Sequence, residues 1–226
     1  MKPILLFDID GTLLHVKKLF IQELIHTIMK DLGLNRDKLS AMPFAGRTDK
    51  DIFNDIAGRL TNESDKKEEL FEEIKDAYLK VLLRDLASDH VDLIEGVSET
   101  VHVAVENNLD VGLCTGNFRE AAHKKIEAAG LTNLFFFGGF GCEHADRKHL
   151  PEAAHLEYVK FSGSEPERKA YVIIGDTPND IRSAKYFGAR SVAVTTGSFS
   201  SEDLKVHKPD KLVENLRELI PVYITS

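Results

Sequence analysis

Residues 5–13 read LLFDIDGTL, an apolar run that is broken by two carboxylates and a glycine. The run predicts a short buried strand, and the glycine predicts a turn directly after it. Asp8 and Asp10 are two residues apart, so both can lie on one side of a strand, where their charges repel. A divalent cation offsets such charge, and carboxylate oxygens suit Mg²⁺. The stretch therefore predicts a magnesium site, in preference to a solvated turn, at the end of the first strand.

Composition is that of a globular protein with an acidic balance. The chain has 226 residues, of which 42% are hydrophobic and 29% are charged, enough to bury a substantial core. A net charge of −8 argues against nucleic acid or an anionic membrane as the main partner. Cys114 and Cys142 form no Cys-x-x-Cys motif, no apolar run could span a bilayer, and the N-terminus lacks a signal-peptide pattern. We therefore expect a cytoplasmic protein.

The part of the chain from about Val16 to Val91 is predicted to be helical, with no strand. Phe20, Leu24 and Ile28 recur at the spacing of one helix face. A second helix is expected at 49–60, and a strongly charged third segment carries another apolar stripe. This block follows the first strand directly, which indicates an insertion.

Beyond Gly96, strands and helices alternate. Strands are expected at 109–114, 134–137, 171–174 and 191–195. Helices are expected between these strands, and two short helical segments are expected at 201–206 and 211–219. This alternation predicts an α/β fold whose parallel sheet is covered on both faces. We assign residues 1–15 and 92–226 to this core and residues 16–91 to the helical insertion.

Polar side chains follow three of the predicted strands. They are Asp8 with Asp10, the turn Thr115–Asn117, and Asp176 with Asp180. The carboxyl ends of parallel strands meet at one edge of the sheet, where ligands bind. The three groups therefore bring carboxylates for one cation next to a hydroxyl and backbone N–H groups suited to phosphate oxygens.

The motifs at 8–12, 115–117 and 175–180 together resemble those of the haloacid dehalogenase superfamily. The branch in question has a helical cap and includes phosphoglycolate phosphatases and β-phosphoglucomutases. The resemblance covers essentially the whole chain. It implies a Rossmann-like core, a helical cap at 16–91, and Mg²⁺-dependent phosphoryl transfer through a phospho-aspartate.

The resemblance also implies roles for individual residues. Asp8 would be the nucleophile that attacks phosphorus, and Asp10 the acid that protonates the leaving oxygen and then activates water. Thr115 would hold the transferring phosphoryl oxygens together with the N–H groups of Gly116 and Asn117.

The metal ligands implied by the same resemblance come from two of the motifs. The Asp8 carboxylate, the Asp10 backbone carbonyl and Asp176 would bind Mg²⁺. Asp180 would contact the ion directly or through water. The ion would neutralise charge between the nucleophile and the phosphate.

Two basic positions are expected to bind phosphate or the leaving group. The family has a basic residue, usually lysine, before its last motif, and residues 146–151 here read DRKHLP. We assign this basic position to Arg147, because a guanidinium can hydrogen-bond to a phosphate and a carboxylate at the same time, and Lys148 is the alternative. In the cap, the stretch 46–49 resembles a loop that reaches over the active site, so Arg47 is a candidate contact to the leaving group.

The leading function is therefore a Mg²⁺-dependent phosphatase that acts on a small phosphorylated metabolite. A phosphosugar mutase is the main alternative, because it shares every core residue. A phosphate-binding or receiver-like regulatory module is disfavoured by the size of the helical insertion and by the full set of acids. Asp10 also argues against dehalogenation, since dehalogenases normally lack the second acid. No residue pattern points to a particular oligomeric state.

Overall fold

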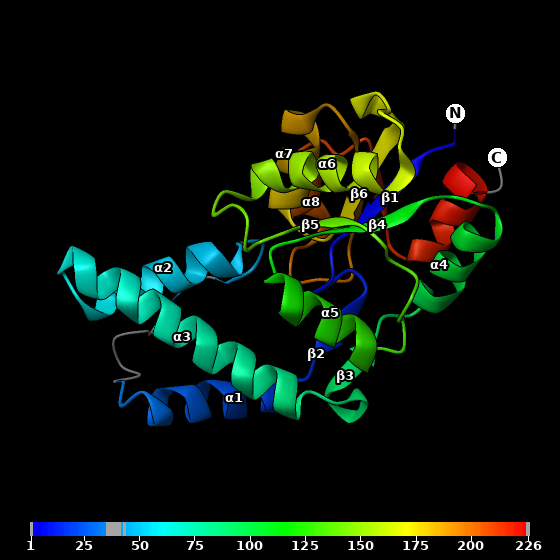
Figure 1. The fold of residues 1–226 in the computed structure, drawn as a ribbon. Helices are drawn as coiled ribbons and strands as arrows, with labels where there is room; N and C mark the ends of the chain where they lie inside the picture. Colours follow the sequence, from blue (N-terminus) through cyan, green and yellow to red (C-terminus); the bar gives the residue numbers. More distant parts are fainter. Residues whose placement is uncertain (1, 35–41, 43, 225–226) are drawn as a thin grey trace.

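The computed structural model describes residues 2–34, 42 and 44–224, and its core is a six-stranded sheet in which every neighbouring pair is parallel (Figure 1). In spatial order the strands are β5 (Gly138–Phe140), β4 (Val111–Thr115), β1 (Ile4–Phe7), β6 (Tyr171–Gly175), β7 (Arg190–Val194) and β8 (Lys211–Val213). The predicted α/β class is thereby confirmed.

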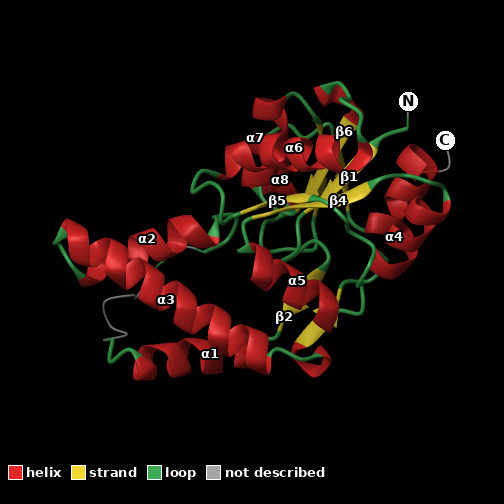
Figure 2. Cartoon of the chain, viewed as in Figure 1, coloured by secondary structure: helices red, strands yellow, loops and turns green. Residues whose placement is uncertain are grey.

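Helices cover both faces of this sheet (Figure 2). They are α4 (Val97–Glu106), α5 (Arg119–Ala128), α6 (Leu150–Ser162), α7 (Pro178–Phe187) and α8 (Ser201–Val206). Leu5 and Phe7 of β1 pack in the cluster that contains residues of α4 and α5, whereas Ile4 and Leu6 pack in the cluster of α6 and α7. Because successive side chains of a strand point to opposite faces, a central strand buried on both sides is apolar throughout.

A layer of three helices lies apart from the sheet, and we call it the cap (Figure 1). It consists of α1 (Lys18–Asp31), α2 (Asp49–Leu60) and α3 (Ser64–Asp85). The Thr48 side chain accepts a hydrogen bond from the N–H of Asp51 at 3.1 Å, so Thr48 is the N-cap of α2. No helix in the described ranges is long and apolar enough to cross a membrane.

The expectation that no strand occurs at the ends of the inserted block is wrong. The antiparallel strands β2 (Leu14–Val16) and β3 (Val91–Leu93) pair where the chain passes between core and cap. Each has three residues, too few to show a period in sequence, and they form because the two passages lie side by side. The boundaries at 15/16 and 91/92 fall within this pair, and the division into two domains stays a prediction.

Two other elements also differ from expectation. The strand expected at 134–137 forms instead at Gly138–Phe140, because α6 packs directly on this backbone: a Cβ on Gly139 would lie 2.0 Å from the Leu150 carbonyl oxygen. The helix expected at 211–219 is replaced by β8 and a 3₁₀ turn at Leu216–Leu219. Pairing with β7 at the edge of the sheet outweighs local helical preference there.

Candidate active site

The three polar strand ends meet at one edge of the sheet. Strand β1 lies between β4 and β6, and all three run in the same direction. Asp8 follows β1, Thr115 ends β4, and Asp176 follows β6, and all three are buried. Asp8 is fixed by its N–H, which donates to the Ile174 carbonyl oxygen at 2.9 Å. The topology therefore brings residues more than 160 positions apart in sequence into one site.

Three of the acids form a compact cluster. One carboxylate oxygen from each of Asp8, Asp176 and Asp180 lies within 4.8 Å of the others. Burial raises the pKa of Asp176 to about 8, and the negative charges of Asp8 and Asp180 add to the effect. The backbone at Gly11 closes on this carboxylate, since a Cβ there would lie 2.5 Å from an Asp176 oxygen. The negative charges of these carboxylates repel one another, and a bound cation would offset this repulsion.

A divalent cation fits the donor set. All the ligand atoms on offer are carboxylate oxygens, which suit Mg²⁺ better than a softer metal. The hydroxyl of Thr12 donates to Asp176 at 3.2 Å and orients that carboxylate. Thr177 orients Asp180, because its N–H and hydroxyl donate to one oxygen at 3.0 and 2.7 Å. The other oxygen of Asp180 accepts from Arg147.

Arg147 is the buried cation of this cluster. It begins the 3₁₀ turn Arg147–His149 in front of α6, and its side chain is only 7% exposed. One guanidinium nitrogen lies 2.9 Å from Asp8 and 2.6 Å from Asp180, and Nε donates to the same Asp180 oxygen at 3.0 Å. The pKa of Asp8 still rises, to about 6, because burial and then the nearby Asp180 outweigh Arg147. Arg147 thus supplies positive charge beside the candidate nucleophile.

Lys148 lies at the surface. Its ammonium pairs with Asp146 at 2.7 Å and lies 5.5 Å from the centre of the Tyr186 ring. It is not among the described residues that line the cavity in front of the acids. Lys148 is therefore given no part in the proposed phosphate site.

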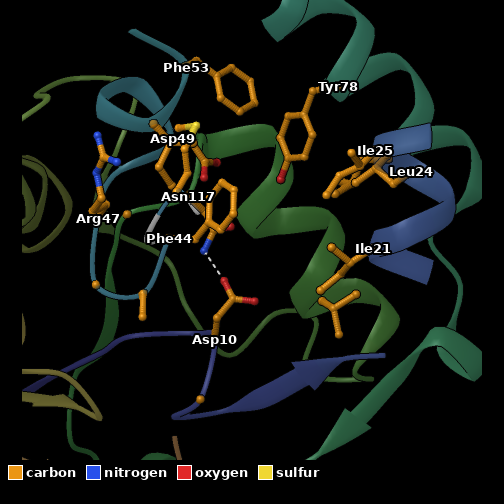
Figure 3. A pocket seen from close by; sticks show the side chains of 18 of the residues that line it. Asp10, Ile21, Leu24, Ile25, Phe44, Arg47, Asp49, Phe53, Tyr78 and Asn117 are labelled. Carbon is orange, nitrogen blue, oxygen red and sulfur yellow. Dashed lines mark hydrogen bonds between the residues drawn. The ribbon is translucent and has the colours of Figure 1, made fainter. Parts of the chain in front are cut away.

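Asp10 points away from the acid cluster, toward helix α5. Both of its oxygens lie close to the Lys125 ammonium, at 2.8 and 2.6 Å, and one also accepts from the Asn117 side-chain amide at 2.7 Å (Figure 3). The Lys125 ammonium in turn donates to the Asn117 side-chain oxygen at 2.6 Å. Burial raises the pKa of Asp10, but the charge and hydrogen bond of Lys125 outweigh it, so the pKa lies below its usual value. Asp10 is thereby held as a carboxylate.

The turn after β4 combines a hydroxyl with a tightly packed backbone. The Thr115 hydroxyl accepts from the Asn117 N–H at 3.4 Å and from its side-chain amide at 2.8 Å. Gly116 has no room for a side chain, since a Cβ would lie 2.2 Å from the Arg47 carbonyl oxygen. Its own carbonyl accepts from the Asp49 N–H at 2.7 Å. The turn after β4 and the cap loop are thus in direct contact.

The cap loop is held over the site by further hydrogen bonds. The Asn179 amide donates to the Gly46 carbonyl at 2.5 Å, and the Thr48 hydroxyl donates to the Ala145 carbonyl at 2.7 Å. One Asp49 oxygen accepts from the Phe118 N–H at 2.8 Å. The loop therefore closes one side of the site.

The guanidinium of Arg47 faces helix α2, which begins two residues later. Nε lies 2.6 Å from Asp51, and a second nitrogen lies 3.1 Å from Asp55. These two carboxylates raise the pKa of Arg47, with the Asp51 hydrogen bond the largest cause. Arg47 lines the cavity, but the described contacts anchor it to α2.

Sequence reasoning missed Lys125, Asp49 and Tyr78. All three line the same cavity as Asp8 and Asp10. Helical phase could have found Lys125, which is four residues after the buried Ala121 and therefore on the inner face of α5. The sequence indicates Asp49 only as a helix cap, and Tyr78 only as part of the apolar stripe of α3.

Comparison with known proteins finds hydrolases and phosphatases that resemble this chain over nearly its whole length. The family model described as "Haloacid dehalogenase-like hydrolase" matches residues 5–194. The pyrophosphatase PpaX of Bacillus cereus (strain AH820) is 25% identical over 221 residues, covering 96% of this chain and 94% of that protein. The crystal structure of CbbY from Rhodobacter sphaeroides in complex with phosphate has a TM-score of 0.69 at 17% identity, covering 97% of this chain and 96% of that one. A predicted phosphoglycolate phosphatase from Haemophilus somnus has a TM-score of 0.65 at 19% identity, covering 98% and 97%.

Proposed function

Because the chain belongs to the haloacid dehalogenase-like hydrolase family and is a phosphatase, we propose that it hydrolyses a small phosphorylated metabolite by a Mg²⁺-dependent route through a phosphorylated Asp8. One observation carries the proposal. Asp8 lies within 4.8 Å of two further carboxylates and 2.9 Å from a buried guanidinium, in a cavity that also contains Asp10. Asp8 is thus a candidate nucleophile beside a candidate cation site, and the Arg147 guanidinium that bridges Asp8 and Asp180 is suited to binding phosphate.

In the first step, a carboxylate oxygen of Asp8 attacks phosphorus, and the bond from phosphorus to the ester oxygen breaks. The leaving oxygen takes a proton, which Asp10 delivers in its protonated form. In the second step, water attacks phosphorus while Asp10 accepts a proton from it, and the bond between phosphorus and the Asp8 oxygen breaks. This step regenerates the Asp8 carboxylate and forms inorganic phosphate. The ion pair with Lys125 favours the carboxylate form of Asp10, which is the form needed to activate water.

The remaining residues bind and orient. Asp8, Asp176, Asp180 and the backbone carbonyl of Asp10 would hold Mg²⁺, which supplies positive charge next to the phosphoryl oxygens. Arg147 would bind another phosphoryl oxygen while keeping its contact with Asp180. The Thr115 hydroxyl and the N–H groups of the turn after it would complete the phosphate site. A phosphosugar mutase would use the same groups, and no contact among the described residues favours it.

The test is hydrolysis of p-nitrophenyl phosphate with Mg²⁺ or with chelator. We expect activity that needs both Mg²⁺ and Asp8, so that Asp8→Asn is inactive. The matched control is Asp89→Asn, an acid whose side chain is 79% exposed, and it should retain native activity. Mass spectrometry of Asp10→Asn after exposure to substrate should find phosphate attached to Asp8, because water attack is slowed in that variant. Full activity in Asp8→Asn would refute the proposal.

A further inference from the structure

The candidate active site opens into a large cavity that extends between the cap helices. Its volume is about 980 Å³, which is at the upper end for small-molecule sites. Asp8, Asp10 and Arg147 line its core end. Inorganic phosphate or phosphoglycolate would occupy a small part of it. The structure therefore leaves much space beside the reacting phosphoryl group, where the leaving group must lie.

The walls of that space are apolar. The lining includes Ile21, Leu24 and Ile25 from α1, Tyr78 from α3, Phe53 from α2 and Phe44 from the cap loop (Figure 3). Ile21 is 40% exposed and Phe44 51% exposed, so these two side chains offer apolar surface to a ligand, whereas Leu24 and Phe53 are buried. A small polar leaving group would leave water against these side chains, which is unfavourable.

The charged groups among the described lining residues do not suit a second anionic moiety. The lysines and arginines that line it, within the described residues, are Arg47, Lys125 and Arg147. Each is already paired with carboxylates of this chain. Asp10 and Asp49 add negative charge at the same place. Among the described residues, the outer phosphate of a pyrophosphate would meet these acids without a further cation.

We infer that the substrate is a phosphate monoester of an extended apolar alcohol, whose chain lies between α1, α2 and α3 while its phosphate lies at Asp8. This inference rests on the proposed function and specifies its substrate class. The apolar chain contributes binding energy that does not depend on hydrogen bonds, so chain length is the property to vary.

The experiment measures kcat/KM for ethyl, butyl, hexyl and octyl phosphate by release of inorganic phosphate. Each buried methylene should increase kcat/KM about fourfold, or on the order of a hundredfold from ethyl to hexyl phosphate. The gain should come mainly through KM, because the chain binds equally in the ground and transition states. Phosphoglycolate, glucose 6-phosphate and pyrophosphate serve as polar comparators and should be poorer substrates than octyl phosphate.

Two variants on α1 locate the chain. Ile21→Asp places a charge in the cavity wall and should lower kcat/KM for octyl phosphate at least tenfold and flatten the dependence on chain length. Leu19→Asp is the matched control, because Leu19 is on the same helix, is 67% exposed and does not line the cavity. As a readout independent of turnover, octyl phosphonate should raise the melting temperature more than ethyl phosphonate does, and Ile21→Asp should remove the difference.

The outcomes separate the two proposals. If p-nitrophenyl phosphate is hydrolysed with dependence on Asp8 but kcat/KM is flat with chain length, the inference is wrong and the proposed function stands. A preference for pyrophosphate or a sugar phosphate over octyl phosphate would likewise overturn the inference and leave the proposed function intact. If no phosphate ester is hydrolysed, both proposals fail together.

Discussion

Replacing Lys125 with methionine removes the charge that holds Asp10 as a carboxylate and keeps much of the side-chain volume. The ammonium lies 2.8 and 2.6 Å from the two Asp10 oxygens, and 2.6 Å from the Asn117 side-chain oxygen. An opposite charge at close range lowers a carboxyl pKa by about 1–3 units. The Asp10 side chain is 46% exposed to the cavity, so solvent screens part of the effect. Lys125→Met is therefore expected to raise the Asp10 pKa.

The sign of the effect on catalysis follows from the second step. Water activation needs the carboxylate form of Asp10, so raising its pKa moves the acid limb of the kcat profile to higher pH. At a fixed acidic pH the ionised fraction, and with it kcat, falls about tenfold per unit of pKa. At alkaline pH, where Asp10 is ionised in both proteins, the two rates should converge.

The assay is kcat against pH with p-nitrophenyl phosphate at saturating Mg²⁺. Lys124→Met is the matched control, because Lys124 is the preceding residue of α5 and pairs with Glu127 at 3.4 Å, away from the site. Circular dichroism verifies that both variants are folded. An acid limb that stays in place in Lys125→Met, or that moves equally in the control, would refute the role given to this ion pair.

Three further predictions concern the close contacts of the site. Gly116→Ala places a Cβ 2.2 Å from the Arg47 carbonyl oxygen and must displace the cap loop by about 1 Å, so kcat/KM should fall on the order of a hundredfold. The control is Gly58→Ala, whose Cβ would meet only a lysine side chain at 3.5 Å and which should keep native kinetics. Phe118→Ala removes a fully buried ring between core and cap, so the free energy of unfolding in urea should fall by about 3–5 kcal/mol. A fall of less than about 1 kcal/mol would show that the ring is dispensable. Because the pKa of Asp176 is raised to about 8 without metal, the folded protein binds its proton more tightly than the unfolded chain does. In chelator, the free energy of unfolding should therefore fall by about 2 kcal/mol between about pH 6 and 8, and Asp176→Asn should abolish this fall.

The acids at the strand ends could be anticipated because their signal is local. An apolar run that ends in Asp-x-Asp-Gly carries both the strand and the charge, and the family match confirms the resemblance drawn from these motifs. The sequence alone does not determine whether Arg147 or Lys148 is the cation near the acids, because adjacent residues of a short turn have no periodicity to separate them. Lys125 was missed because two lysines stand side by side in α5, and only the phase of the helix, set by the apolar residues around them, indicates that Lys125 is the one that points inward.

The apolar cavity could not be predicted from the sequence, because it depends on how far apart the three cap helices lie. The stripes on α1 and α3 predict faces that are buried, and the same pattern arises whether they pack tightly on each other or leave room between them. The strands β2 and β3 were missed because their pairing is set by the meeting of two distant segments.

That short strand pair has a mechanical consequence. The chain enters the cap at Val16 and leaves it at Val91, and these two residues are register partners in the pair. Because the two passages of the chain pair along all three residues of each strand, we expect them to move together rather than independently. The strand pair begins at Leu14, whose carbonyl accepts from the Gly11 N–H at 2.9 Å, one residue after Asp10. Any movement of the cap helices would therefore pass through this strand pair to the loop that carries Asp10.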